Sequence, residues 1–156
     1  MARSEETRSE TGEAIAFSYA LKESPAEVWR ALTEPALIAR WLMPAPDFRA
    51  EVGCRFTFQA RPAPGWDGVV HCEVLAVERE RLLRYSWRGG SAEIEGYGHL
   101  LDTVVTWTLA SGEGGGTLLG LHHAGFREQN AFALRAMRQG WSTTGASIER
   151  VLGASD

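Results

Sequence analysis

Apolar side chains alternate with polar or small ones in several stretches of the chain, and this period of two is typical of half-buried β-strands. The first such stretch contains Ile15, Phe17 and Tyr19. After a helical region the alternation returns in five segments, which we expect to be strands joined by short turns. Their apolar positions are Val52, Cys54, Phe56 and Phe58; Val69 to Val77; Leu83, Tyr85 and Trp87; Val105, Trp107 and Leu109; and Leu119, Leu121 and His123. Short connections favour antiparallel pairing, because parallel strands need long crossovers.

Two short helices are expected between the first strand and the others. Ser24 is a good N-cap residue, Pro25 suits the first helical position, and Glu27 stands three residues after the cap, as in a capping box. Residues 36–42 have the pattern of a second short helix, which the prolines after it, beginning with Pro44, should end.

The last segment changes to a helical period, with apolar residues at steps of three and four. These are Phe126, Ala133, Leu134, Met137, Trp141, Thr144, Ile148 and Val151. They predict one helix of about 25 residues, about 40 Å long, whose apolar stripe needs a long surface to cover it. The strands supply that surface. The predicted fold is therefore α+β: a curved antiparallel sheet wrapped around a long C-terminal helix, with two short helices after the first strand.

Length and composition fit one globular domain. The chain has 156 residues, of which 44% are hydrophobic and 23% charged, close to the average for folded domains. Residues 1–12 carry almost no large apolar side chains, so we expect a disordered N-terminal arm followed by a single domain over residues 13–152.

Charge and cysteine content narrow the list of partners. A net charge of −4 gives no broad basic surface for a phosphate backbone, so nucleic acid is not expected as a partner. No apolar run approaches the roughly 20 residues needed to cross a bilayer, so no membrane span is expected either. Cys54 and Cys72 are too few for a disulfide framework, and no secretory signal precedes them. We therefore expect a cytoplasmic protein with free thiols.

A bent sheet around one helix leaves room for a cleft where the sheet diverges from the helix. Inward side chains should line it, and a wall of aromatic and apolar groups with a few polar tips is typical of a pocket for a small hydrophobic or aromatic ligand. The candidate lining is Trp41, Met43, Phe56, Phe58, Tyr85, Trp87, Trp107, His123, Met137 and Trp141. The alternative is that these rings simply fill the core. A cavity well under about 300 Å³ would leave no room for a drug-sized ligand.

The positions of the histidines do not favour a catalytic site or a metal site. His122 and His123 are adjacent in a strand, so their side chains point to opposite faces and cannot bind one metal ion together. No Cys-x-x-Cys or His-Glu-x-x-His spacing occurs, so neither a metal site nor a cofactor is expected. His123 shares the inward face with Leu121; it is either a hydrogen-bonded core residue or the best-placed general base or ligand partner. His71 is the second candidate.

Short motifs follow one another in a set order along the chain. They are Pro25-Ala26-Glu27-Val28-Trp29-Arg30-Ala31-Leu32-Thr33, Trp41, Val52-Gly53 before Phe56-x-Phe58, Arg81-Leu82-Leu83, Gly116-Thr117, His123-x-Gly125-Phe126 and Gly140-Trp141. Over about residues 13–152 the chain resembles the SRPBCC (START-like, birch-pollen-allergen-like) superfamily, and within it the group named after the C-terminal domain of the activator of heat-shock protein 90 ATPase. The resemblance implies a helix-grip fold with a cavity between sheet and helix.

The superfamily includes lipid, hormone and polyketide binders, a few cyclases and hydrolases, and the co-chaperone domain itself, so the fold alone does not fix the function. Three functions stay open: a non-enzymatic binder of a small hydrophobic ligand, a chaperone-associated interaction module, and a cyclase- or hydrolase-like enzyme. Because related domains often pair, the resemblance also allows a homodimer. Members usually have glycine where this chain has Cys54 and Cys72, and the added volume is expected to shrink or reshape the cavity.

Overall fold

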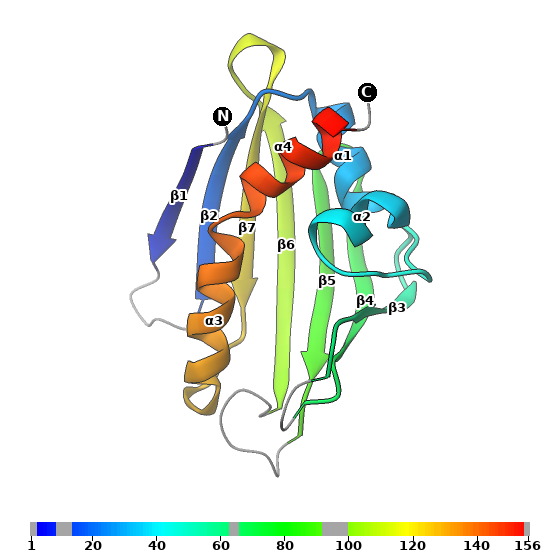
Figure 1. Ribbon diagram of the computed structural model, residues 1–156, viewed down its shortest axis with the longest axis vertical. Helices are drawn as coiled ribbons and strands as arrows, with labels where there is room; N and C mark the ends of the chain where they lie inside the picture. The colour runs from blue at the N-terminus through cyan, green and yellow to red at the C-terminus, as the bar shows by residue number, and fades with distance from the viewer. Residues whose placement is uncertain (1–2, 9–13, 63–65, 92–99, 155–156) are drawn as a thin grey trace.

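Seven antiparallel strands form one curved sheet in the computed structural model, which describes residues 3–8, 14–62, 66–91 and 100–154 (Figure 1). Across the sheet the strands follow the order β1-β2-β7-β6-β5-β4-β3. Their bounds are β1 Arg3–Arg8, β2 Ala14–Leu21, β3 Arg55–Gln59, β4 Val69–Glu78, β5 Leu82–Gly89, β6 Leu101–Ser111 and β7 Thr117–Ala124. Most strands pair with their sequence neighbours, as the short connections predicted, and the α+β helix-grip arrangement is confirmed.

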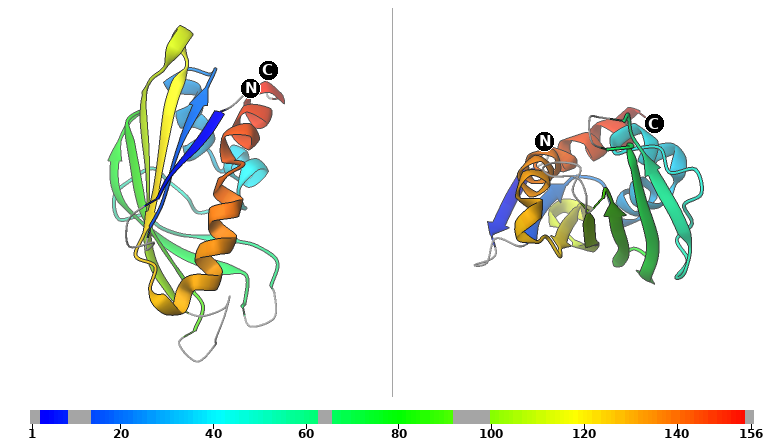
Figure 2. Two further views of the ribbon diagram at one scale, coloured as in Figure 1. Left: turned by 90° about the vertical axis from the view of Figure 1, so that its left-hand side faces the viewer. Right: turned by 90° about the horizontal axis from the view of Figure 1, so that it is seen from below.

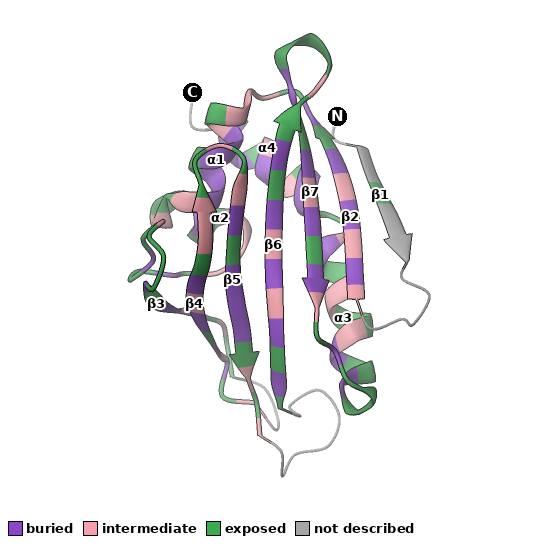
Figure 3. Cartoon of the chain, turned by 180° about the vertical axis from the view of Figure 1, so that it is seen from behind, coloured by how far each residue is buried: buried purple, intermediate pink, exposed green. Residues whose placement is uncertain are grey.

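The alternation along each strand decides which face is buried. In β6, Val105, Trp107 and Leu109 point into the core, whereas their neighbours are half-buried or exposed. Seen from behind, buried and exposed residues alternate along β6 and β7 (Figure 3). The inward face packs against the helices, which lie on the concave side of the sheet (Figure 2). The sheet bends further at a register shift between Val74 and Ala76, where β4 pairs with β5.

The first two helices form where the capping signals predicted them. In α1 (Pro25–Thr33) the Ser24 hydroxyl accepts a hydrogen bond from the Glu27 backbone N–H at 3.3 Å. The return bond of a capping box does not form, because the Glu27 carboxylate lies beside Arg30 at 3.3 Å instead. Helix α2 (Pro35–Trp41) follows directly. None of the described helices is long and apolar enough to span a bilayer.

The single long C-terminal helix that the sequence predicted is divided into two. Helix α3 (Ala131–Trp141) follows a short 3-10 turn at Glu128–Asn130, and α4 (Thr144–Ala154) continues after a break at residues 142–143. Figure 1 shows the change of direction between α3 and α4. Helix α3 lies along the sheet near β2, whereas α4 crosses towards α1 and α2.

Hydrogen bonds around the break give its physical cause. The Trp141 backbone carbonyl, which a continuous helix would bond internally, accepts a hydrogen bond from the Tyr19 hydroxyl at 2.7 Å. The Ser142 hydroxyl donates to the Gln139 carbonyl at 2.5 Å. Side chains that bond nearby carbonyls compete with the helix and bend it. Periodicity alone could not predict this, because the apolar stripe continues through the break.

Two sequence expectations differ from the structure at strand ends. Residues 3–8, expected within a disordered arm, form β1 and pair with β2 from Arg3 to Arg8; residues 1–2 and 9–12 lie outside the described part. Backbone pairing at a sheet edge needs no apolar side chains, so the hydrophobic pattern gave no signal. Val52, expected on the inward face of a strand, lies in a turn before β3 and is 67% exposed.

Candidate functional site

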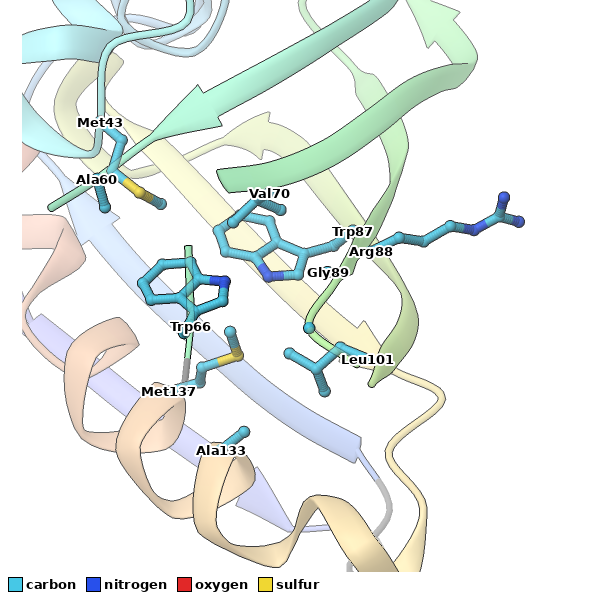
Figure 4. Close-up of a pocket in the computed structure, with 11 residues that line it drawn as sticks. Met43, Ala60, Trp66, Val70, Trp87, Arg88, Gly89, Leu101, Ala133 and Met137 are labelled. Atoms are coloured by element: carbon cyan, nitrogen blue, oxygen red, sulfur yellow. The ribbon is translucent and has the colours of Figure 1, made fainter. Parts of the chain in front are cut away.

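A cavity of about 150 Å³ lies between α3 and the β4–β6 side of the sheet (Figure 4). Helix α3 contributes Ala133 and Met137, β5 contributes Trp87, and the first residue of β6 contributes Leu101. The other lining residues come from the ends of β4 and β5 and from the segments that follow α2 and β3: Met43, Ala60, Trp66, Val70, Arg88, Gly89 and Gly90. In this region the sheet diverges from the C-terminal helices (Figure 2).

A second cavity of about 230 Å³ adjoins the first at the break between α3 and α4. Met43, Trp87 and Met137 line both cavities. The remaining walls of the second cavity are Trp41, Leu42, Ala136, Gly140, Trp141, Thr143, Thr144 and Ser147. Each volume is below the roughly 300 Å³ of a pocket for a drug-sized molecule. Either cavity alone therefore suits a smaller ligand.

The structure separates the ten predicted lining residues into two equal sets. Trp41, Met43, Trp87, Met137 and Trp141 line one or both cavities. The other five are packed in the core and line neither cavity: Phe56, Phe58, Tyr85, Trp107 and His123. All ten occupy the concave side of the sheet, but only the first set lies beside the open space.

Edge-to-face packing explains why the aromatic rings around Phe56 line no cavity. The Phe56 ring lies 4.9 Å from Phe48, 5.2 Å from Phe58 and 5.5 Å from Tyr85, each at a steep angle. Such pairs are favourable beyond their buried area. Phe48 comes from the segment after α2, whose position the strand pattern did not predict. Its buried ring covers Phe56 on β3.

His123 is a structural residue by its hydrogen bonds. Its Nδ1 accepts from the Trp141 indole N–H at 3.1 Å, and its Nε2 lies 2.8 Å from the Thr103 hydroxyl oxygen. The Thr103 hydroxyl donates its own hydrogen to the Trp87 carbonyl at 2.8 Å, so it accepts from His123 Nε2–H. This network assigns the neutral Nε2–H tautomer. Both ring nitrogens are engaged, so no lone pair is left to act as a general base.

Burial also favours the neutral form of His123. Removal from water, and secondarily the neighbouring His122, lower the pKa of His123 to about 3. The Tyr85 hydroxyl, which accepts from the Trp107 indole N–H at 2.9 Å, has a pKa raised by burial.

His71, the second candidate for a general base or ligand partner, is exposed on β4. Among the described residues, no group of three or more His, Cys, Asp or Glu side chains could hold a metal ion.

The two cysteines lie beside the aromatic core and line neither cavity. Cys54 Sγ is 3.5 Å from the Asp47 carbonyl, and Cys72 sits on β4 opposite Phe56. Both thiols are free, and burial raises the pKa of Cys72. Their side chains therefore add volume to the buried core and do not themselves form a cavity wall.

Sequence reasoning missed several walls of the first cavity. Trp66 stands in a turn-rich segment between β3 and β4, where no periodicity gives a direction to its side chain. Leu101 is the first residue of β6. It stands four positions before Val105 and two before Thr103, so the alternation along the strand could have predicted that its side chain points inward. Ala133 belonged to the predicted helical stripe, but its small side chain did not suggest a cavity wall.

Together, the curved sheet, the C-terminal helices and the cavity between them define a protein of the SRPBCC class with a helix-grip fold. Residues 22–153 match the family described as "Activator of Hsp90 ATPase homolog 1-like protein". The chain belongs to this family.

Solved structures agree with the assignment. Protein MLL2253 from Mesorhizobium loti is 36% identical, with a TM-score of 0.79 over 92% of this chain and 98% of the other. CalU16 from Micromonospora echinospora is 27% identical, with a TM-score of 0.64 over 97% and 85%. DynU16, from the dynemicin biosynthetic locus, shares the fold at 20% identity and a TM-score of 0.71; the match covers 92% of this chain and 48% of DynU16. No curated protein matches.

Proposed function

We propose that the protein binds a small hydrophobic or aromatic ligand in the cavity between the sheet and α3. The observation that carries the proposal is the cavity of about 150 Å³ whose walls are mainly the apolar side chains of Trp66, Trp87, Leu101 and Met137. An apolar cavity of about this size can hold a benzene-sized molecule. Burial of the ligand's apolar surface would supply most of the affinity.

The adjoining cavity sets the upper size of the ligand. Met43 and Met137 stand at the wall that both cavities share, and unbranched methionine side chains adapt readily to a neighbour's shape. A ligand with one ring would occupy the first cavity. A ligand with a second ring would reach past the two methionines towards Trp141.

Filling the first cavity should weaken ligand binding. Ala133 is buried and lines this cavity, so Ala133→Leu would place three more carbons in the space that a ligand needs. We expect Ala133→Leu to weaken toluene binding at least tenfold, measured by an NMR titration, while the protein stays folded.

A matched variant on the same helix provides the control. Ala131 is exposed and lines neither cavity, so Ala131→Leu adds the same volume elsewhere and should bind toluene like the wild type. Native mass spectrometry of freshly purified wild type should show a retained small molecule that Ala133→Leu lacks. Equal toluene affinity in a folded Ala133→Leu variant and in the wild type would contradict the proposal.

The family description favours a second candidate function, a chaperone-associated interaction module that acts through its surface. Exposed apolar groups such as Phe132 on α3, which is 56% exposed beside the Arg135 guanidinium, would then contact the partner. Under this function, adding the protein should raise the ATP hydrolysis rate of purified heat-shock protein 90, and Phe132→Ala should reduce that effect. An unchanged hydrolysis rate would remove this candidate.

A further inference from the structure

The indole N–H of Trp87 differs from those of three other tryptophans that pack in or beside the core. Trp41 donates to the Ala31 carbonyl at 2.7 Å, Trp107 to the Tyr85 hydroxyl at 2.9 Å, and Trp141 to His123 Nδ1 at 3.1 Å. Trp87 Nε1 is buried but has no acceptor among the described residues. An indole N–H can only donate, and a buried donor without an acceptor is destabilising. The exception therefore needs an explanation.

Trp87 is fixed in position at the wall of the open space. Its side chain is 2% exposed and lines both cavities. Its ring lies 5.2 Å from Phe58, 5.5 Å from His123 and 5.7 Å from Trp141, so neighbours on several sides hold its orientation. Figure 4 shows the indole nitrogen on the ring edge that faces the space bordered by Trp66 and Met137. An acceptor atom placed in that space could reach the N–H.

The rest of the lining restricts the charge of the ligand. Among the described residues that line the two cavities, Arg88 is the only one with a charged side chain. Its Nε donates to Asp102 Oδ1 at 2.8 Å in an exposed ion pair, and Figure 4 shows the guanidinium directed away from the cavity. A buried anion would lose its hydration without gaining a counter-charge. A neutral acceptor, such as a carbonyl oxygen, fits the uncharged N–H donor of Trp87.

We propose that the Trp87 indole N–H is the polar anchor of the cavity, and that the ligand is a small neutral aromatic molecule with one carbonyl-type acceptor. This inference rests on the proposed function and specifies the ligand's chemistry. Hydrophobic contact with Trp66, Leu101 and Met137 would hold the ring, and the hydrogen bond to Trp87 would fix its orientation. A benzene-sized ring with one short carbonyl substituent matches both the cavity volume and the Trp87 donor.

Two probes of nearly equal shape test the hydrogen bond. Acetophenone carries a carbonyl oxygen where α-methylstyrene carries a methylene group. Their affinities are measured by titration for the wild type and for Trp87→Phe, which keeps an aromatic ring but removes the N–H. Because the two probes differ in hydrophobicity, the informative quantity is the ratio of their affinities in each protein, as in a double-mutant cycle. We expect Trp87→Phe to shift that ratio against acetophenone by about five- to tenfold.

Trp66→Phe is the matched control, because it removes an indole N–H from the same cavity and leaves Trp87 intact. It should keep the wild-type ratio. A second measurement does not depend on a variant's folding: in the wild type, acetophenone should move the assigned Trp87 indole proton resonance downfield, and α-methylstyrene should not.

The outcomes separate this inference from the proposed function. Binding of both probes with the same ratio in the wild type and Trp87→Phe, or no downfield shift of the Trp87 resonance, would overturn the hydrogen bond but leave ligand binding standing. A ratio that changes in Trp66→Phe instead would assign the donor to Trp66 and also overturn it. If neither probe binds the wild type, the proposed function fails, and this inference fails with it.

Discussion

Replacing Trp141 by alanine is expected to lower the free energy of unfolding by about 3–5 kcal/mol, the usual range for removing a large aromatic side chain from a core. The indole of Trp141 is buried against Trp87 and Trp107, with ring centroids 5.7 and 5.5 Å away. It also donates the hydrogen bond that holds His123. The substitution therefore opens a cavity and leaves the Nδ1 lone pair of His123 without its donor.

Chemical denaturation measures this effect, and Phe132 on the same helix gives the control. Phe132 is exposed, so Phe132→Ala should change the free energy of unfolding by less than about 1 kcal/mol. Trp141→Phe keeps most of the ring but loses the N–H, and it should fall between the two. If Trp141→Ala costs no more than Phe132→Ala, the central position that the structure gives to Trp141 is wrong.

Acid is expected to destabilise the protein through His123, by up to about 1.4 kcal/mol per pH unit. Its pKa is lowered to about 3 in the folded protein, from an ordinary value of 6.5. The unfolded chain therefore binds a proton that the folded chain resists. The stabilisation is fully present above about pH 6.5 and is lost as the pH falls towards 3.

Two glutamine variants separate the contribution of His123 to the pH dependence of stability from that of the Asp and Glu carboxylates. His123→Gln cannot titrate, yet its amide offers a donor towards Thr103 and an acceptor towards Trp141. The wild type should lose stability relative to His123→Gln between pH 6.5 and pH 4, whereas His71→Gln, a change at an exposed residue of β4, should keep the wild-type difference from His123→Gln. Parallel pH profiles for the wild type and His123→Gln would contradict the neutral assignment.

The parts of the fold that rest on local patterns were predictable from the sequence. Period-two alternation located β2 and the strands from β4 to β7, and Ser24 located the start of α1. The break after Trp141 was not predictable, because one of the hydrogen bonds that stabilise it comes from Tyr19, 122 positions away in the sequence. Strand β1 was missed because edge pairing depends on backbone groups rather than on apolar side chains.

The candidate site was predictable only in part, for a similar reason. Alternation tells which strand side chains face inward, and the six predicted residues on strands are all buried: Phe56, Phe58, Tyr85, Trp87, Trp107 and His123. It does not tell where a loop will fill the space in front of them. Phe48, from the segment after α2, packs onto Phe56 and closes that region. Trp66, from another loop, forms a wall of the space that stays open.

A crystal structure of the protein soaked with bromobenzene would show whether an aromatic ligand enters the cavity, because the anomalous scattering of bromine locates the ligand independently of the protein's density. We expect a bromine peak between Trp87, Leu101 and Met137, inside the cavity beside α3. Bromine found only on the outer surface, or well-ordered side chains closing that space with no bromine in it, would contradict ligand binding in this cavity.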